Sequence, residues 1–227
     1  LSFGAIRIQL WHGIPAKWVG GVTKDNPDFY HRRSWFYETF IFDHLHGDYA
    51  VTTSHAMDHV YSAMFRMPKE RLFLGGYPRL CTFFMSEKER IEFIRKFENH
   101  SLLEQYQQIS NLKGRKVIYM PTFRDAKPDY IMEAIPDWKN LNDFCCQNDV
   151  YLFVKTHRAA KMPDVKSLSN VRILSNELDI YPLLPLFDMM VSDYSSVTYD
   201  FSTLNKKIAM YTYDIEEYLT DSRPIPD

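Results

Sequence analysis

The chain has 227 residues, of which 45% are hydrophobic and 25% are charged, and these values are typical of a globular protein. A formal net charge of -2 argues against a protein that binds nucleic acid through an excess of basic residues. Three cysteines are too few for a disulfide framework and fit a reducing compartment, and no run of about 18 apolar residues predicts a membrane span.

Short strands and helices are predicted to alternate over the first 80 residues. Residues 5–11 alternate apolar and polar side chains as a strand does, and a turn with His12, Gly13 and Pro15 follows directly. Ser54 is placed to cap a helix whose apolar side chains recur at helical spacing. The predicted elements of this part are strands at 5–11, 49–53 and 71–74 and helices at 34–46 and 54–64.

The rest of the chain repeats this alternation with longer elements. Two charged or amphipathic helices, at 86–97 and 102–109, are predicted to connect the two halves. Beyond them the pattern predicts strands at 116–120, 150–155, 171–174, 189–191 and 207–211, helices at 138–147 and 197–204, and a short helical turn at 179–184. Strands that alternate with helices indicate an α/β protein with a parallel sheet covered on both faces.

The most informative segment follows the predicted strand at 189–191. A polar group of Ser192, Asp193, Ser195 and Ser196 stands there, directly before a predicted helix. The first turn of a helix has unpaired N–H groups and a partial positive charge, so this arrangement favours a phosphate-binding turn. Asp and Ser are also the ordinary residues that cap helices, and capping alone is the alternative interpretation.

Polar side chains also follow other predicted strands, where ligands bind in open α/β sheets. His12 stands after the first strand and could move a proton near neutral pH, while Gly13 would let the backbone approach a ligand closely. A histidine bonded only to the backbone is the alternative.

Further basic side chains stand at or after the ends of two other predicted strands. Lys155, His157 and Arg158 could neutralise a diphosphate, and the Arg124 guanidinium could hold two phosphate oxygens. The alternatives are a solvated basic loop and a local pair between Arg124 and Asp125. We interpret residues 76–79 as a turn only, and because no acidic or Cys/His cluster has the spacing of a metal site, we expect no metal and no cofactor.

Five motifs, in this order along the chain, resemble those of the CDP-glycerol glycerophosphotransferase family, the teichoic-acid primases and polymerases and their capsule relatives. They are residues 11–17, 76–79, 121–125, 155–157 and 192–201. The chain departs from the family pattern at Ile14, Phe123 and Arg158, where the family usually has Thr, Trp and Pro. These departures do not change the side chains that could take part in the reaction. They leave undetermined which polyol or sugar the donor carries.

The resemblance implies a GT-B fold, in which two Rossmann-like domains face each other across a cleft. We therefore expect an acceptor-side domain over residues 1–80, a helical connection over 81–114 and a nucleotide-binding domain over 115–227. The sequence begins inside an apolar segment without a starting methionine, and we expect it to be a truncated fragment of a longer protein.

The resemblance also implies an activity: transfer of glycerol phosphate, or a related polyol phosphate, from a CDP-activated donor to a hydroxyl of a teichoic-acid or capsule-type polymer, with release of CMP. The implied catalytic residues are His12, which resembles the family's catalytic base, and His157, which resembles its second essential histidine. Residues that we expect to bind substrate are Gly13, Arg124, Lys155, Asp193, Ser195 and Ser196.

Family members act on lipid-linked acceptors at the cytoplasmic face of the bacterial cell membrane, so the resemblance implies a peripheral membrane association and no nucleic-acid partner. Two alternatives stay open. A glycosyltransferase of the same fold would use a nucleotide sugar and release a nucleoside diphosphate. An interaction domain would keep the fold without turnover.

Overall fold

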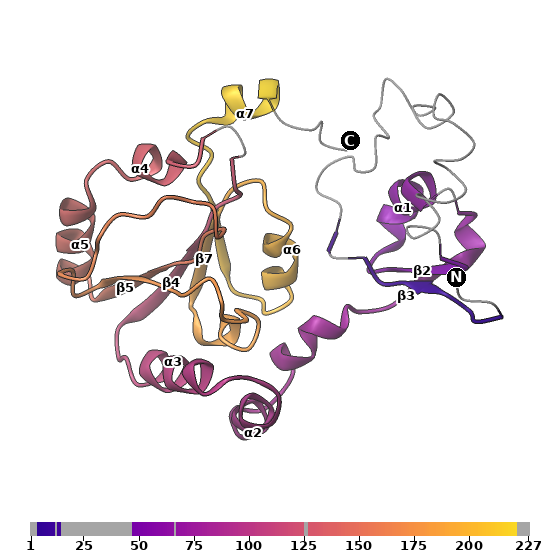
Figure 1. Cartoon of the computed structure of the whole chain (residues 1–227), viewed down its shortest axis with the longest axis horizontal. Coiled ribbons are helices and arrows are strands. Elements are labelled where there is room, and N and C mark those ends of the chain that lie inside the picture. The colour runs from indigo at the N-terminus through magenta and orange to yellow at the C-terminus, as the bar shows by residue number, and fades with distance from the viewer. Residues whose placement is uncertain (1–3, 12, 15–46, 66, 125–126, 222–227) are drawn as a thin grey trace. The chain divides into compact units, whose positions relative to one another are not determined.

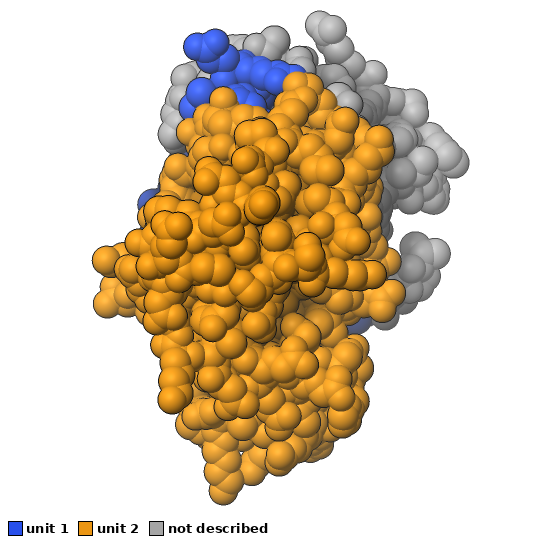
Figure 2. Space-filling view, turned by 90° about the vertical axis from the view of Figure 1, so that its left-hand side faces the viewer, with its two compact units in different colours: residues 1–78, 214–227 blue, residues 79–213 orange. Residues whose placement is uncertain are grey.

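The computed structural model describes residues 4–11, 13–14, 47–65, 67–124 and 127–221. The chain forms two compact units, which are coloured separately in Figure 2. The first unit comprises Leu1–Pro78 and Asp214–Asp227, and the second unit comprises Arg79–Tyr213. The segment predicted to be a connection, residues 81–114, therefore groups with the second unit, while the domain boundaries expected at 80 and 114 stay predictions.

The first unit contains a parallel sheet of three short strands in the order β1-β2-β3. Its elements among the described residues are β1 (Ile8–Gln9), β2 (Tyr49–Thr52), η4 (His55–Met57), α1 (Asp58–Phe65), η5 (Lys69–Arg71), β3 (Leu72–Leu74) and α7 (Ile215–Asp221). The strand predicted at 5–11 shortens to two residues because only Ile8 and Gln9 pair with β2. The helix predicted at 34–46 lies outside the described residues.

The core of the first unit is formed by the apolar side of α1. Val60, Tyr61 and Met64 recur at helical spacing and pack with Phe65 against Ala50 of β2. The predicted cap is present, since the Ser54 side chain accepts a hydrogen bond from the Ala56 N–H, although the first turn is a 3-10 helix. The sequence pattern therefore identified this helix correctly.

The second unit starts with helices. After η6 (Pro78–Phe83) come α2 (Glu87–Phe97) and α3 (His100–Ser110), which contact each other. Ser86 and Glu89 form a capping box at the start of α2, and Asn99 caps α3. Both helices were predicted from the sequence, whereas η6 is a correction, because residues 76–79 were interpreted as a turn only.

A five-stranded parallel sheet lies at the centre of the rest of the second unit (Figure 1). Its strands are β4 (Arg115–Met120), β5 (Val150–Val154), β6 (Val171–Ile173), β7 (Met189–Ser192) and β8 (Lys207–Met210), in the order β6-β5-β4-β7-β8. The chain builds outward from β4 to β6 and then returns to the other side of β4 with β7. The strand order thus reverses between β4 and β7, which is the point where α/β sheets of this kind bind ligands.

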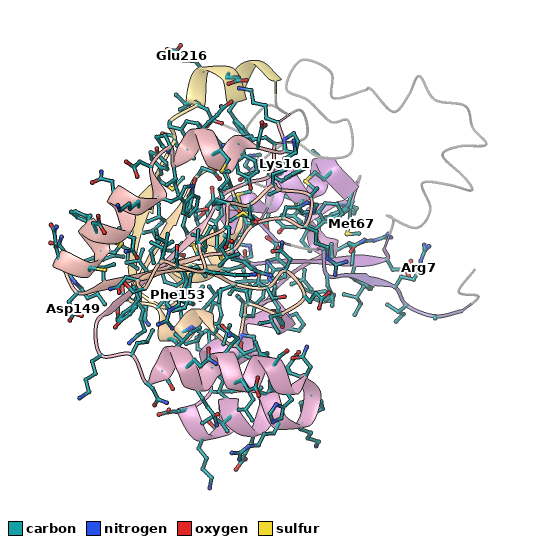
Figure 3. All side chains as sticks on the ribbon, turned by 60° about the vertical axis from the view of Figure 1, so that its left-hand side comes forward. Arg7, Met67, Asp149, Phe153, Lys161 and Glu216 are labelled. Atoms are coloured by element: carbon teal, nitrogen blue, oxygen red, sulfur yellow. The ribbon has the colours of Figure 1, made fainter. Side chains whose placement is uncertain are left out.

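Helices lie on both sides of this sheet. In Figure 1, α4 (Tyr130–Ala134) and α5 (Trp138–Gln147) lie on one side and α6 (Val197–Ser202) on the other. Alternate residues of β5 follow this arrangement: Leu152 and Val154 pack in the cluster that includes Cys145 of α5. Phe153, between them, packs against Phe187 with ring centroids 5.4 Å apart and lies inside the second unit (Figure 3).

Part of the sheet beside α5 is open. A groove of about 1190 Å³ lies along β4, β7 and β8, and its lining includes Val117 and Val191 of the sheet and Leu141 and Phe144 of α5. Apolar side chains therefore meet solvent along this groove. Among the described residues, no helix has both the length and the apolar character needed to cross a membrane.

Candidate functional site

Two loops meet where the strand order reverses. Met120 at the end of β4 is in register with Ser192 at the end of β7, and the Ser192 hydroxyl donates to the Met120 carbonyl at 2.6 Å. The residues that follow each strand, 121–124 and 193–196, therefore lie next to each other at the carboxyl edge of the sheet. These loops carry two of the motifs singled out from the sequence.

Asp193 joins the two loops. Its side chain is 1% exposed, and one carboxylate oxygen accepts hydrogen bonds from the Thr122 N–H at 2.8 Å and the Thr122 hydroxyl at 2.6 Å. The same oxygen accepts the Tyr194 N–H, and the other accepts Arg124 Nη2 at 2.9 Å. Both carboxylate oxygens are thus occupied by groups that fix the loop geometry.

Arg124 is buried beside Asp193, with a side chain that is 9% exposed. Besides the Asp193 contact, its Nη1 donates to the Thr122 carbonyl at 2.6 Å, and the guanidinium lies 5.2 Å from the Tyr194 ring and 5.6 Å from the Tyr130 ring. Among the described residues, Arg124 pairs with Asp193, 69 residues away. Asp125, the partner considered from the sequence, lies outside the described residues. Ion pairing and ring contacts fix the guanidinium in one place.

Ser195 and Ser196 are half-buried and stand directly before α6. Ser196 occupies the cap position, but its side chain makes no capping hydrogen bond. The Ser195 hydroxyl accepts the Val197 N–H at a long 3.4 Å. Helix capping therefore does not explain why a serine stands at position 196, and the Ser196 hydroxyl is available to bind a ligand.

A third loop follows β5 and carries His157. Its imidazole is exposed and lies against the Phe123 ring of the β4 loop, with centroids 4.6 Å apart. The Ala159 N–H points at His157 Nδ1 at 3.3 Å, and a ring nitrogen that accepts a hydrogen bond leaves the proton on Nε2. In this arrangement His157 can offer an N–H donor beside the switch-point loops.

Lys155 precedes His157 and is half-buried. Its ammonium group donates to the Ser175 carbonyl at 2.7 Å. Burial lowers the pKa of Lys155, although the Asp179 carboxylate acts in the opposite direction. The structure thus brings five sequence-predicted features to one edge of the sheet: Arg124, Asp193, Ser195, Ser196 and the His157 loop. Lys155 instead contacts the Ser175 carbonyl, which follows β6.

Sequence reasoning missed the tyrosines beside this edge. Tyr119 and Tyr130 are 3% and 0% exposed, and their hydroxyls have no hydrogen-bond partner. Burial, followed by the charge of Asp193, raises the pKa of Tyr130 to about 12 and raises that of Tyr119 as well. The only sequence signal was an aromatic content of 15%, which gives no positions.

The turn predicted to carry the catalytic base is described only in part, because His12 lies outside the described residues. On either side of it, Trp11 has φ 55° and Gly13 has φ 143°, so the backbone here takes conformations that L side chains rarely adopt. The Gly13 carbonyl accepts a hydrogen bond from the Tyr61 hydroxyl at 3.3 Å. The meeting of His12 with His157 stays a prediction.

Metal ligands do not cluster in the described part of the chain, where no group of three or more His, Cys, Asp or Glu side chains could hold an ion.

The strand order and the polar loops at its reversal define a Rossmann-like α/β protein with a candidate ligand site at the switch point. The model of the family described as CDP-Glycerol:Poly(glycerophosphate) glycerophosphotransferase matches residues 2–225, and the chain belongs to this family.

Comparisons with individual proteins agree with this family. The chain is 26% identical over 225 residues to the teichoic acid poly(glycerol phosphate) polymerase of Staphylococcus epidermidis, covering 93% of this chain and 29% of that protein. It is 29% identical over 174 residues to the teichoic acid glycerol-phosphate primase of Bacillus subtilis, covering 75% of this chain and 41% of that protein. The chain thus spans well under two thirds of the length of these relatives.

A solved structure of the wall teichoic acid polymerase TagF superposes with a TM-score of 0.63 at 22% identity, covering 93% of this chain and 51% of that one. This likeness confirms the predicted fold class, α/β and GT-B-like. The cleft expected between two domains concerns their relative placement and stays a prediction.

Proposed function

We propose that this chain carries the catalytic part of a transferase that moves glycerol phosphate, or a related polyol phosphate, from a CDP-activated donor to a hydroxyl of a teichoic-acid or capsule-type polymer and releases CMP. One observation carries the proposal beyond family membership. Asp193 joins two motifs of the family, at 121–125 and 192–201, at the edge where Rossmann-like sheets hold nucleotides.

In the proposed reaction the acceptor hydroxyl attacks the β-phosphorus of the donor. A new phosphorus–oxygen bond forms, the bond to the bridging oxygen breaks, and CMP leaves with that oxygen and its electron pair. His12 takes the proton of the attacking hydroxyl. Because phosphoryl transfer needs little covalent help from the protein, most of the rate enhancement comes from positioning and from neutralising charge.

Each described residue has a proposed part in holding the diphosphate. His157 donates from Nε2, Ser195 and Ser196 donate through their hydroxyls, and Arg124 supplies a fixed positive charge whose position Asp193 sets. Gly13 and Lys155 complete the proposed substrate contacts. The acceptor is proposed to be lipid-linked or polymeric and to be met at the cytoplasmic face of the membrane, with the protein attached peripherally.

The role of His12 is tested by turnover. A general base contributes about 10²–10⁴-fold, so His12→Ala is expected to lose most CMP release from CDP-glycerol while calorimetry shows CDP affinity near that of the wild type. Turnover comparable to that of the wild type would contradict the role of base.

The serine contacts are tested by binding. Ser196→Ala removes a hydroxyl that makes no cap, so it is expected to weaken CDP binding without lowering stability. Ser202→Ala is the matched control, because this exposed serine lies at the other end of α6 and donates to the Tyr199 carbonyl. Equal CDP affinity in Ser196→Ala and wild type would count against the contact.

The identity of the leaving nucleotide separates the proposed activity from its alternatives. With CDP-glycerol, CDP-ribitol and nucleotide sugars as donors, the proposal requires CMP as the product. Release of a nucleoside diphosphate would instead indicate a glycosyltransferase. A chain that neither turns over a donor nor binds CDP would be an interaction domain.

A further inference from the structure

A second buried carboxylate lies in the second unit, on α6. The Asp200 side chain is 3% exposed, and one of its oxygens, Oδ2, accepts three hydrogen bonds. Arg79 donates two of them, from Nε at 3.0 Å and Nη2 at 2.8 Å, and the Tyr181 hydroxyl donates the third at 2.7 Å. Two segments far from Asp200 in sequence thus converge on one atom of α6.

The partners of Asp200 are themselves held by aromatic packing. The Arg79 guanidinium lies 5.4 Å from the centre of the Tyr181 ring, and Phe83 of η6 stacks on that ring at 5.9 Å. Burial and the neighbouring Asp200 raise the pKa of Tyr181, so its hydroxyl stays neutral and remains a donor. The cluster therefore combines an ion pair with an additional neutral donor.

The contacts of Asp200 constrain the position of helix α6. α6 has six residues and no side-chain cap, and a helix this short is not stable alone. Buried Val197 and Phe201 attach it to the sheet, but apolar contacts are not directional. A buried ion pair adds little net stability, yet three donors on one oxygen fix the position of Asp200 closely.

We propose that Asp200, held by Arg79 and Tyr181, is a positioning residue for the diphosphate contacts of Ser195 and Ser196. Ser196 stands four residues before Asp200, one helical turn away, so a shift or rotation of α6 at Asp200 moves the serine hydroxyls. This inference rests on the proposed function and deepens it. It also gives Arg79, in the motif at 76–79, a role that the interpretation as a turn did not provide.

Tyr181→Phe is the mildest test, because it removes one hydrogen bond and keeps the ring contacts with Arg79 and Phe83. It is expected to weaken CDP binding about fivefold, measured by calorimetry on the full 227-residue chain well below its melting temperature. Asp200→Asn is expected to weaken binding by on the order of tenfold or more. Glu104→Gln, which removes an exposed pair with His100, is the matched control and should bind CDP as the wild type does.

Two further measurements separate positioning from a general loss of structure. Amide hydrogen exchange should speed up over residues 197–202 in Tyr181→Phe and Asp200→Asn, with β4 and β5 unchanged. In Arg79→Ala, millimolar guanidinium ion should restore part of the CDP affinity, because the Arg79 side chain is 22% exposed and its place can be reached from solvent. The same ion should not help Asp200→Asn.

The failure of this inference is distinguishable from failure of the proposed function. Folded variants of Tyr181, Asp200 and Arg79 that bind CDP with wild-type affinity would overturn the positioning role while the nucleotide site stands. A wild-type chain that binds no CDP would overturn both.

Discussion

The two units contain the same kind of sheet but bury it differently. In β5 of the second unit, Leu152, Phe153 and Val154 are at most 8% exposed. In β3 of the first unit, Phe73 and Leu74 are 49% and 57% exposed, although both strands belong to parallel sheets. Among the described residues, apolar side chains are therefore buried in one strand and about half-exposed in the other, so the same residue types contribute very different stabilisation in the two units.

The units also fix their candidate site residues by different chemistry. In the first unit, the neutral hydroxyl of Tyr61 donates a hydrogen bond to the Gly13 carbonyl, and it is also hydrogen-bonded to the Tyr77 hydroxyl. The second unit uses the buried carboxylates Asp193 and Asp200 with arginine partners. Because uncompensated buried charge is far more costly than a lost neutral hydrogen bond, the second unit should be the more sensitive to substitution.

The contrast in burial should give the largest difference in stability. Phe153→Ala is expected to cost about 3–5 kcal/mol, because it opens a cavity beside Phe187. Phe73→Ala removes a half-exposed ring and is expected to cost less than about 1 kcal/mol. Urea unfolding measures both, and equal losses would break the comparison between the sheets.

The contrast in chemistry is tested at Asp193. Asp193→Asn removes the buried carboxylate charge that pairs with the Arg124 guanidinium, at an expected cost of about 3 kcal/mol. Glu104→Gln removes an exposed pair with His100 and should change the free energy of unfolding by about 0.5 kcal/mol or less. If urea unfolding shows that the two substitutions lower the free energy of unfolding equally, Asp193 does not hold the loops as described.

Alkaline pH should destabilise the second unit through its buried tyrosines. The folded-state pKa of Tyr130 is raised from 10.0 to about 12, and those of Tyr119 and Tyr181 are raised too. A raised folded-state pKa means that the stabilisation is complete below pH 10 and is lost as pH rises toward about 12. Tyr130→Phe should flatten this dependence, and the absorbance of tyrosinate follows the titration.

The smallest expected effects are at the helix caps. Asn99 accepts the Leu102 N–H at 2.9 Å, and Asn99→Ala should cost about 1 kcal/mol. Ser54 accepts the Ala56 N–H at 3.2 Å and caps a short 3-10 turn of the first unit, so Ser54→Ala should cost roughly half as much. Hydrogen exchange resolves the two helices separately, and a larger effect at Ser54 would reverse the expected order.

Regular elements with a clear periodicity were predictable from the sequence. The helix predicted at 138–147 and the strand predicted at 150–155 match α5 and β5 almost residue for residue, because a long amphipathic run and a short apolar run leave few alternatives. Helix α4 was missed because its five residues, between Pro128 and Pro136, are too few to show a helical repeat. The strand at 5–11 was overestimated because alternation alone does not show how many residues find a partner.

The candidate site was predictable in its residues but not in its contacts. Placing Arg124 and Asp193 after strands followed from the sequence, whereas their pairing depends on β7 lying beside β4. The local alternative, Arg124 with Asp125, was the only partner that sequence distance suggested. The contact of Arg79 with Asp200 spans 121 residues and could not be inferred from a motif that looks like a turn.

The open groove over β4, β7 and β8 has a practical consequence for anyone who handles this protein. Environment-sensitive dyes fluoresce when they enter apolar surfaces, and this groove offers such a surface in the folded state. A dye-based melting curve should therefore start from a high signal and understate the transition. Circular dichroism, which reports on the backbone, should give the melting temperature without that background.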